Sequence, residues 1–138
     1  MNDILAISLS GLRASAASFG AAASNIANVN DVSSIPLCSP LEPVQNQSGH
    51  AYQAIIAFQQ NAGANGVTVS YAAKVPSYST AYDPSSLYAN DKGMVAVPNV
   101  NFAEEMVKIA MAVQAFRANM AVIKTADQMT KSALDILS

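Results

Sequence analysis

Residues 4–28 read ILAISLSGLRASAASFGAAASNIAN, and their larger side chains recur in alternating steps of four and three. That spacing keeps one stripe of a helix turned toward a partner helix. It predicts one long helix, about 40 Å in length at roughly 1.5 Å per residue. The stripe consists of Leu5, Leu9, Leu12, Ala16, Phe19, Ala23 and Ile26.

The other end of the chain has the same pattern. Residues 100–137 keep the alternation until Asp127 and Thr130 fall on the stripe, where the apolar positions move to a neighbouring face. Such a shift is typical of a stutter, which locally changes the winding of a coiled coil. Glu104 and Lys108 are an acid-before-base pair that favours the helix. This second stripe consists of Phe102, Met106, Ile109, Val113, Phe116, Met120 and Ile123.

Charged residues are scarce. They make up 12% of the sequence, against about 25% in a typical globular protein, and residues 4–28 carry only Arg13. A helix that merely covers a globular core should show a charged outer face. A buried helical hairpin in a monomer is the alternative, but 138 residues are too few to cover two long helices all round. We therefore expect other protein molecules to cover them. The residues expected at this assembly interface are Leu5, Leu9, Leu12, Phe19, Ala23, Ile26, Met106, Ile109, Val113, Phe116, Met120 and Ile123.

The middle of the chain has strand patterns. Residues 32–48 hold three prolines and several polar residues, which predicts an irregular loop. Apolar side chains alternate in residues 52–58 and again in 67–75, and this period of two predicts strands. The Asn-Gly dipeptide at 65–66 favours a tight turn between them. We therefore expect a β-hairpin.

A second, smaller β element is expected after the hairpin. Val95 and Val97 predict a short strand that Pro98 stops. The tyrosines nearby are expected to pack within the small β region rather than to stack on a ligand, because few basic residues lie among them. They are Tyr71, Tyr78, Tyr82 and Tyr88. The chain then divides into an N-terminal helix (1–30), an irregular and small β region (31–99) and a C-terminal helix (100–138).

Few side chains could converge on a reaction centre. Cys38 lies on a proline-rich loop and His50 is the only histidine, so a Cys–His hydrolase is the weakest function class. Glu104 and Glu105 are about 100° apart around a helix and are not expected to share a site as a carboxylate pair. The sequence has neither a glycine-rich phosphate loop nor metal-ligand spacing. We therefore expect no enzyme activity, no cofactor and no metal.

Neither targeting signals nor the net charge indicates a particular location or partner. With one cysteine, an intrachain disulfide is impossible. The first residues lack a basic region, so a cleaved signal peptide is not expected. No uninterrupted apolar stretch reaches the ~18 residues of a membrane span. The net charge of -2 gives no reason to expect binding to nucleic acid or to a membrane surface.

Short motifs at both ends form a set. The sequence reads SGLRA at 10–14, ASNIAN at 23–28, EMV at 105–107 and AFRAN at 115–119. Residues 82–101 add YDP, then ANDKGMV, then PNVN. In this order the motifs resemble those of the bacterial flagellar rod and hook axial proteins, and residues 82–101 resemble the small proximal-rod subtype. Phe116 and Met94 stand where that pattern has other residues.

The resemblance implies a fold and a function. The N- and C-terminal helices would pair as an antiparallel coiled coil, giving a mainly α fold with a β-hairpin-containing middle. The chain would be exported unfolded through the flagellar type III channel and would stack helically in the basal-body rod, which crosses the periplasm and transmits torque. Its partners would be copies of itself, other rod proteins, the export apparatus and a basal-body ring. A cytoplasmic export-chaperone or regulatory helical module is the competing function.

Three basic residues recur every seven positions in the C-terminal segment. Arg117, Lys124 and Lys131 form one row, which we call the basic row, directly beside the apolar stripe. Charges at such positions commonly set partner choice and register. In a tubular assembly the basic row could instead line a wet central channel. The third interpretation is a solvated helix edge, since exposed basic residues usually contribute little.

Overall fold

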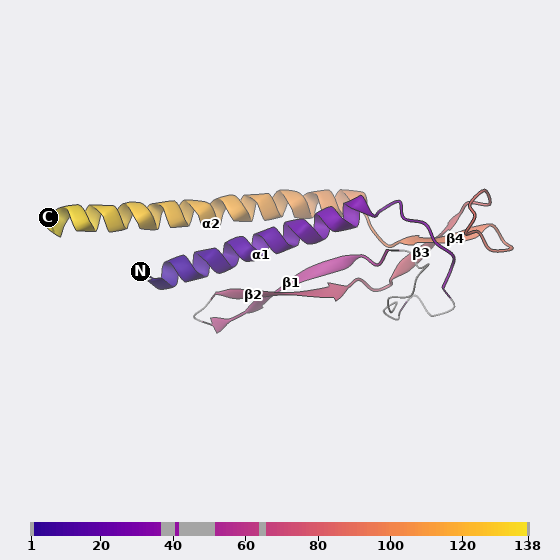
Figure 1. Ribbon diagram of the computed structural model, residues 1–138, viewed down its shortest axis with the longest axis horizontal. Coiled ribbons are helices and arrows are strands. Elements are labelled where there is room, and N and C mark those ends of the chain that lie inside the picture. Colours follow the sequence, from indigo (N-terminus) through magenta and orange to yellow (C-terminus); the bar gives the residue numbers. More distant parts are fainter. Residues whose placement is uncertain (1, 37–40, 42–51, 64–65, 138) are drawn as a thin grey trace.

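The computed structural model describes residues 2–36, 41, 52–63 and 66–137. Two long helices dominate it: α1 spans Asn2–Ala27 and α2 spans Phe102–Leu137. The helices lie side by side and antiparallel, so that both chain ends lie at one end of the molecule (Figure 1). The expected fold class, mainly α with a small β region, is confirmed. Cys38 and His50 lie outside the described residues, and so does the hydrolase hypothesis built on them.

The expected hairpin is present. Strand β1 (Ile55–Asn61) pairs antiparallel with β2 (Val67–Ala73), and Asn61 lies opposite Val67. The connection is five residues, 62–66, and not the two-residue turn that the Asn-Gly dipeptide favours. A hydrogen bond from Ala62 N–H to the Gly66 carbonyl (2.9 Å) closes this wider loop.

A second strand pair lies near the end of the molecule where α1 ends and α2 begins. Strand β4 (Met94–Pro98) is the short strand expected at Val95 and Val97, but Pro98 belongs to it. Its partner is β3 (Tyr78–Tyr82), which we did not predict. Pro98 pairs with the first residue of β3, at the end of the ladder, where a missing N–H costs least.

The other elements are arranged around α1. α2 lies along one side of α1, and the β1–β2 hairpin lies along the opposite side (Figure 1). Within this packing, the Ser10 hydroxyl of α1 accepts a hydrogen bond from Val67 N–H of β2 (3.1 Å). The chain leaving α1 is tied to β4, because Ser33 and Ala96 exchange two backbone hydrogen bonds of 2.9 and 3.0 Å. The helix pair therefore positions both strand pairs.

Both helices contain stretches long and apolar enough to cross a membrane by length and composition. This corrects the expectation drawn from uninterrupted apolar runs, since the helices reach the threshold with small polar residues interspersed. One or two such helices are weak evidence of a span, because core helices of soluble proteins pass the same test. Only 28% of the stretch in α1 and 6% of that in α2 is buried inside the chain. The monomer therefore leaves most of this apolar surface uncovered.

Candidate assembly interface

Small and polar residues form the seam between the two helices. Gly11 of α1 lies so close to α2 that a Cβ added to it would come within 2.7 Å of the Asn119 side chain. Together with half-buried Gly11 and Asn119, buried residues recur one position before the predicted stripes, and we call this set the packed seam; one of its members, Asn25, bonds β1. It comprises Ser8, Gly11, Ser15, Ala22 and Asn25 in α1 and Glu105, Ala112, Asn119 and Ala126 in α2.

The large apolar stripes are not the surfaces through which the two helices of one chain pair. The packed seam lies one residue earlier than the predicted stripe in each helix, which is a rotation of about 100°. The contact between the helices is thus made by Gly11 and not by Leu12, and by Asn119 and not by Met120. The distance between two helix axes depends on the side chains at the contact, so small residues allow an approach that Leu and Met would prevent.

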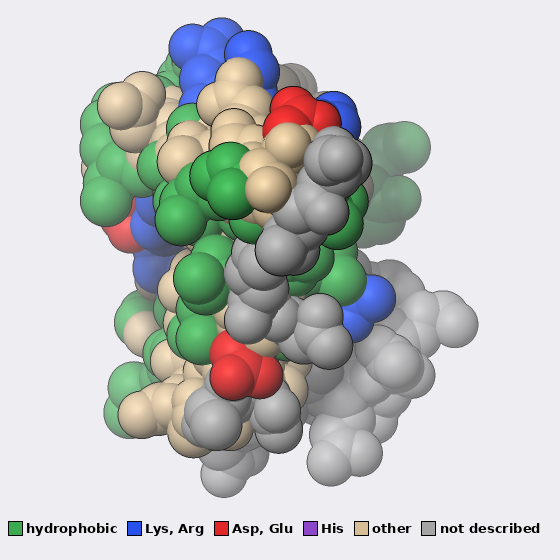
Figure 2. All heavy atoms as spheres, turned by 90° about the vertical axis from the view of Figure 1, so that its left-hand side faces the viewer, with side chains coloured by type: hydrophobic (Ala, Val, Ile, Leu, Met, Phe, Trp, Pro, Cys, Tyr) green, Lys and Arg blue, Asp and Glu red, His purple; other side chains and the backbone are tan. Residues whose placement is uncertain are grey.

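The predicted stripes consequently remain at the surface of the monomer. Among the twelve residues expected at the assembly interface, six are between 41% and 49% exposed: Leu5, Leu9, Phe19, Met106, Phe116 and Met120. The others are half-buried: Leu12, Ala23, Ile26, Ile109, Val113 and Ile123. Figure 2 shows hydrophobic side chains reaching the surface over the end of the helix pair. We call these twelve residues the outer stripe.

The outer stripes of the two helices meet along one groove. It has a volume of about 430 Å³ and is lined by Ala16 and Phe19 from α1 and by Val113, Phe116 and Arg117 from α2. The β1–β2 hairpin does not contribute to this lining. The packed seam therefore leaves an apolar, aromatic-walled groove open on the side of the helix pair.

The basic row borders this groove. Arg117, Lys124 and Lys131 are all exposed, and Arg117 contributes to the groove wall. Lys131 forms an ion pair of 2.7 Å with Asp127, one turn earlier. Within the described part of the chain, Arg117 and Lys124 form no ion pair. Their charges are therefore available to another molecule or to solvent.

Asn25 locks the hairpin onto α1, a role that the sequence analysis missed. It is 1% exposed; its amide nitrogen donates to the Ile55 carbonyl and its amide oxygen accepts from Ile55 N–H, both at 2.9 Å. The Tyr52 hydroxyl donates to the same oxygen (3.1 Å) and also bonds the Ser24 hydroxyl (2.9 Å). A side-chain amide presents an N–H donor and a C=O acceptor side by side, so it can bond both the C=O and the N–H of one backbone residue. The asparagine in ASNIAN therefore fixes where β1 begins.

Replacing Asn25 with leucine should destabilise the isolated protein strongly. The change leaves the N–H and C=O of Ile55 buried without partners, at about 1–3 kcal/mol for each group. The measurement is the free energy of unfolding from denaturant titration. Asn28→Leu is the matched control, because the Asn28 amide bonds only the Ser24 carbonyl at the helix end. An equal loss in both variants would contradict the role of Asn25.

Charged side chains gather at the first turns of α2. The Lys108 ammonium lies 2.8 Å from a carboxylate oxygen of Glu104 and 2.8 Å from Glu105 Oε1. Lys108 thus bonds both Glu104, its expected acid-before-base partner, and Glu105, because the lysine stem places its ammonium between positions three and four residues earlier. Lys74, which directly follows β2, approaches Glu104 at 3.9 Å.

The opposite charges in this cluster favour the ionised forms of Glu104 and Lys108. The hydrogen bond and the charge of Lys108, with the charge of Lys74, hold the pKa of Glu104 below its ordinary value. Burial opposes the charged form of Lys108, but the two glutamates outweigh it, so the pKa of its ammonium is raised. Both shifts favour the ionised forms of Glu104 and Lys108.

The loop between β3 and β4 is held in shape by its own side chains. The Asp83 carboxylate accepts from Ser85, and the Asn90 amide oxygen accepts from Lys92 N–H (2.9 Å) and Met94 N–H (3.0 Å). Gly93 has a φ of 71°, and a Cβ there would lie 2.9 Å from the Tyr82 ring. These contacts account for the YDP and GMV motifs as structural features of the loop.

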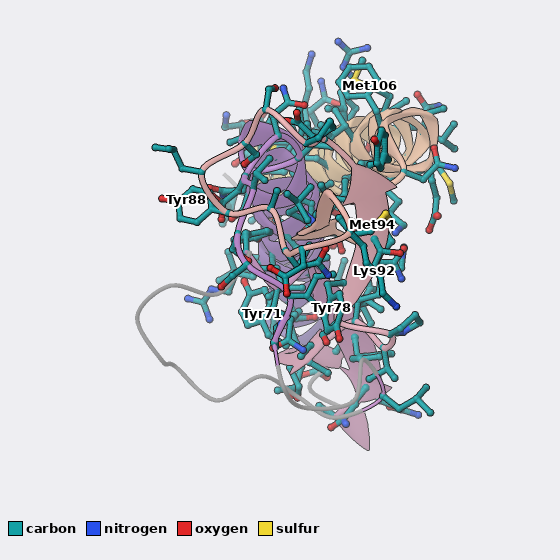
Figure 3. The ribbon with its side chains drawn as sticks, turned by 90° about the vertical axis from the view of Figure 1, so that its right-hand side faces the viewer. Tyr71, Tyr78, Tyr88, Lys92, Met94 and Met106 are labelled. Carbon is teal, nitrogen blue, oxygen red and sulfur yellow. The ribbon has the colours of Figure 1, made fainter. Side chains whose placement is uncertain are left out.

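The tyrosines are packed less completely than expected. Tyr78 is buried, whereas Tyr71, Tyr82 and Tyr88 are between 51% and 72% exposed. In Figure 3, Tyr88 projects from the outer edge of the loop while Tyr78 lies within the molecule. Among the described residues no cluster of His, Cys, Asp or Glu suits a metal ion.

A family model matches part of the chain. Residues 91–136 match the model described as "Flagellar basal body rod FlgEFG protein C-terminal". This region contains β4 and nearly all of α2, including the α2 half of the outer stripe and the basic row.

Curated relatives share the printed name flagellar basal-body rod protein FlgC. The relative from Escherichia coli is 30% identical over 97% of this chain and 96% of its own length. The Bacillus subtilis relative is 29% identical over 96% of this chain and 95% of its own length. The relative from Borreliella burgdorferi is 47% identical over 60 residues, which cover 41% of this chain and 40% of that protein. The last match spans well under half the length of the relative.

Proposed function

Because this chain belongs to the flagellar basal-body rod protein family, we propose that it is a structural subunit of the proximal rod that assembles helically and transmits torque. The observation that carries the proposal is the outer stripe, whose large side chains remain half-exposed although two helices are already paired. Contiguous apolar surface of this kind marks sites where another protein binds. A helical stack of subunits would cover it.

The finer aspects of this role follow from the same proposal. The partners are copies of the chain and other rod proteins along the outer stripe, with the export apparatus and a basal-body ring during delivery and anchoring. The chain works in the part of the basal body that crosses the periplasm, after export as an unfolded polypeptide. Its task is mechanical, with no catalytic step. The relatives described above lend no support to the export-chaperone alternative.

Affinity purification tests this function. A tagged copy of the chain replaces the original gene, and complexes are recovered separately from envelope and cytosolic fractions. We expect the envelope fraction to yield the chain together with basal-body proteins. Phe19→Ser combined with Phe116→Ser provides the matched variant, because it removes the aromatic walls of the groove and should abolish that recovery. A stable complex confined to the cytosol would contradict the proposal.

A further inference from the structure

A crevice on the other side of the helix pair contains an unusual carboxylate. The crevice has a volume of about 320 Å³ and lies between α1, α2 and β1. Most of its lining is apolar, from residues such as Ala22, Ile55 and Ala112. Glu105 and Lys108 bring charge into it. A mostly apolar crevice with a few convergent polar groups is the usual form of a binding site.

The buried carboxylate of Glu105 is only partly hydrogen-bonded. The residue is 1% exposed, and Lys108 bonds only its Oε1 atom. Its Oε2 atom is buried and has no hydrogen-bond partner within the described residues. Buried polar atoms in folded proteins are nearly always hydrogen-bonded, and a carboxylate oxygen without a donor is costly. The monomer thus holds an acceptor whose donor is missing.

We propose that in the assembled rod the Arg117 side chain of a second copy enters this crevice and donates to Glu105 Oε2. The inference rests on the function proposed above. Within one chain, Arg117 lies twelve residues along α2 from Glu105, about 18 Å at 1.5 Å per residue, so it cannot serve its own carboxylate.

Charge and shape support this assignment. Arg117 is exposed and forms no ion pair in the described part of the chain, so its guanidinium can bond another molecule. A guanidinium presents a planar fork of donors that suits a carboxylate, and it is less strongly hydrated than the ammonium of lysine. In a helical assembly each copy uses two different surfaces toward its neighbours. The exposed edge of α2 and the crevice would be such a pair.

Two methionine variants separate assembly from folding. Glu105→Met replaces the buried carboxylate with an apolar side chain of similar size. It removes an acceptor oxygen that has no donor, and Lys108 keeps its ion pair with Glu104, so the fold should persist. Glu104→Met is the matched control, since Glu104 also bonds Lys108 but its side chain is 49% exposed. We expect Glu105→Met to stay folded and to enter the rod at least about tenfold less well than Glu104→Met. Equal incorporation of the two variants would overturn the proposal.

A double-mutant cycle identifies the donor. If Arg117 of a second copy bonds Glu105, then Arg117→Met should lower incorporation as much as Glu105→Met, and the double variant should be no worse than either. Additive losses would show that another group serves Glu105. The unsubstituted chain is the reference for both tests. If it fails to purify with basal-body proteins, the proposed function fails; if it succeeds and the variants match it, only this inference fails.

A photoreactive benzoylphenylalanine in place of Met111, which lines the crevice and is 66% exposed, gives an independent check. Irradiated rods should yield a cross-link to the segment around Arg117 of a second copy, identified by mass spectrometry. Cross-links only within one chain, or only to a different rod protein, would exclude a second copy as the occupant.

Discussion

Ala23→Leu is expected to block entry into the rod while leaving the isolated protein folded. Ala22→Leu, in contrast, is expected to destabilise the fold of the isolated protein. Ala22 is 1% exposed where α1 meets α2 and β1, at the wall of the crevice, so the carbons of leucine that the crevice does not take up should overpack this contact at a cost of about 1–3 kcal/mol. Ala23 is half-buried on the outer stripe, so part of a larger side chain there can extend into solvent in the isolated chain, whereas it would clash with a neighbouring subunit packed on the stripe. One substitution at adjacent positions therefore separates folding from assembly.

Two measurements resolve the pair. Denaturant titration of each purified variant gives the free energy of unfolding, and fractionation of cells gives the amount that enters the basal body. The proposal requires a near-normal unfolding free energy with lost motility for Ala23→Leu. Normal swimming with that variant would mean that no neighbouring helix packs tightly at this point of the outer stripe.

Reversing the charges of the basic row is the second change with a large expected effect. If Arg117 and Lys124 face a neighbouring subunit, replacing both with glutamate should abolish incorporation, because repelling or unpaired buried charges cost about 2–5 kcal/mol. If the row lines a channel, the double variant should assemble but slow the passage of later exported subunits. Rod assembly and hook length, scored separately, distinguish the two outcomes.

Lys92→Glu serves as the control for this experiment. Lys92 is exposed on the β3–β4 loop, away from the helices, so its reversal should leave both measurements unchanged. Wild-type rods and hooks in the double variant as well would leave the solvated helix edge as the remaining interpretation of the basic row.

Periodicity in the sequence predicted the elements well and their contacts poorly. The two helices and the β1–β2 hairpin follow from steps of four and three and of two, which reflect local backbone geometry. The helix contact did not follow, because the stripes of large apolar side chains do not mark it. The chain instead pairs Gly11 with Asn119 and leaves Phe19 half-exposed. Hydrophobicity alone does not say whether a stripe faces its own chain or another.

The missed residues were polar, and their partners are distant in sequence. Asn25 bonds Ile55, thirty residues later, so nothing near it in the chain reveals its role. A signal was available on the same face of the helix: Ser8, Ser15 and Ala22 recur every seven positions, and Asn25 follows Ala22 by three. Such a row is best explained by close helix approach. Strand β3 was missed because Tyr78–Tyr82 is short and contains two polar residues.

The unequal lengths of the helices give each subunit a direction. α2 is ten residues longer than α1, and its last turns carry Met129, Leu134 and Ile136 at 63%, 61% and 84% exposure. The opposite end of the molecule presents the β3–β4 loop and no comparable helical ledge (Figure 1). Two unlike ends can join head to tail repeatedly, but they cannot close a symmetric pair. The chain thus has the asymmetry that a polar filament requires of its building block.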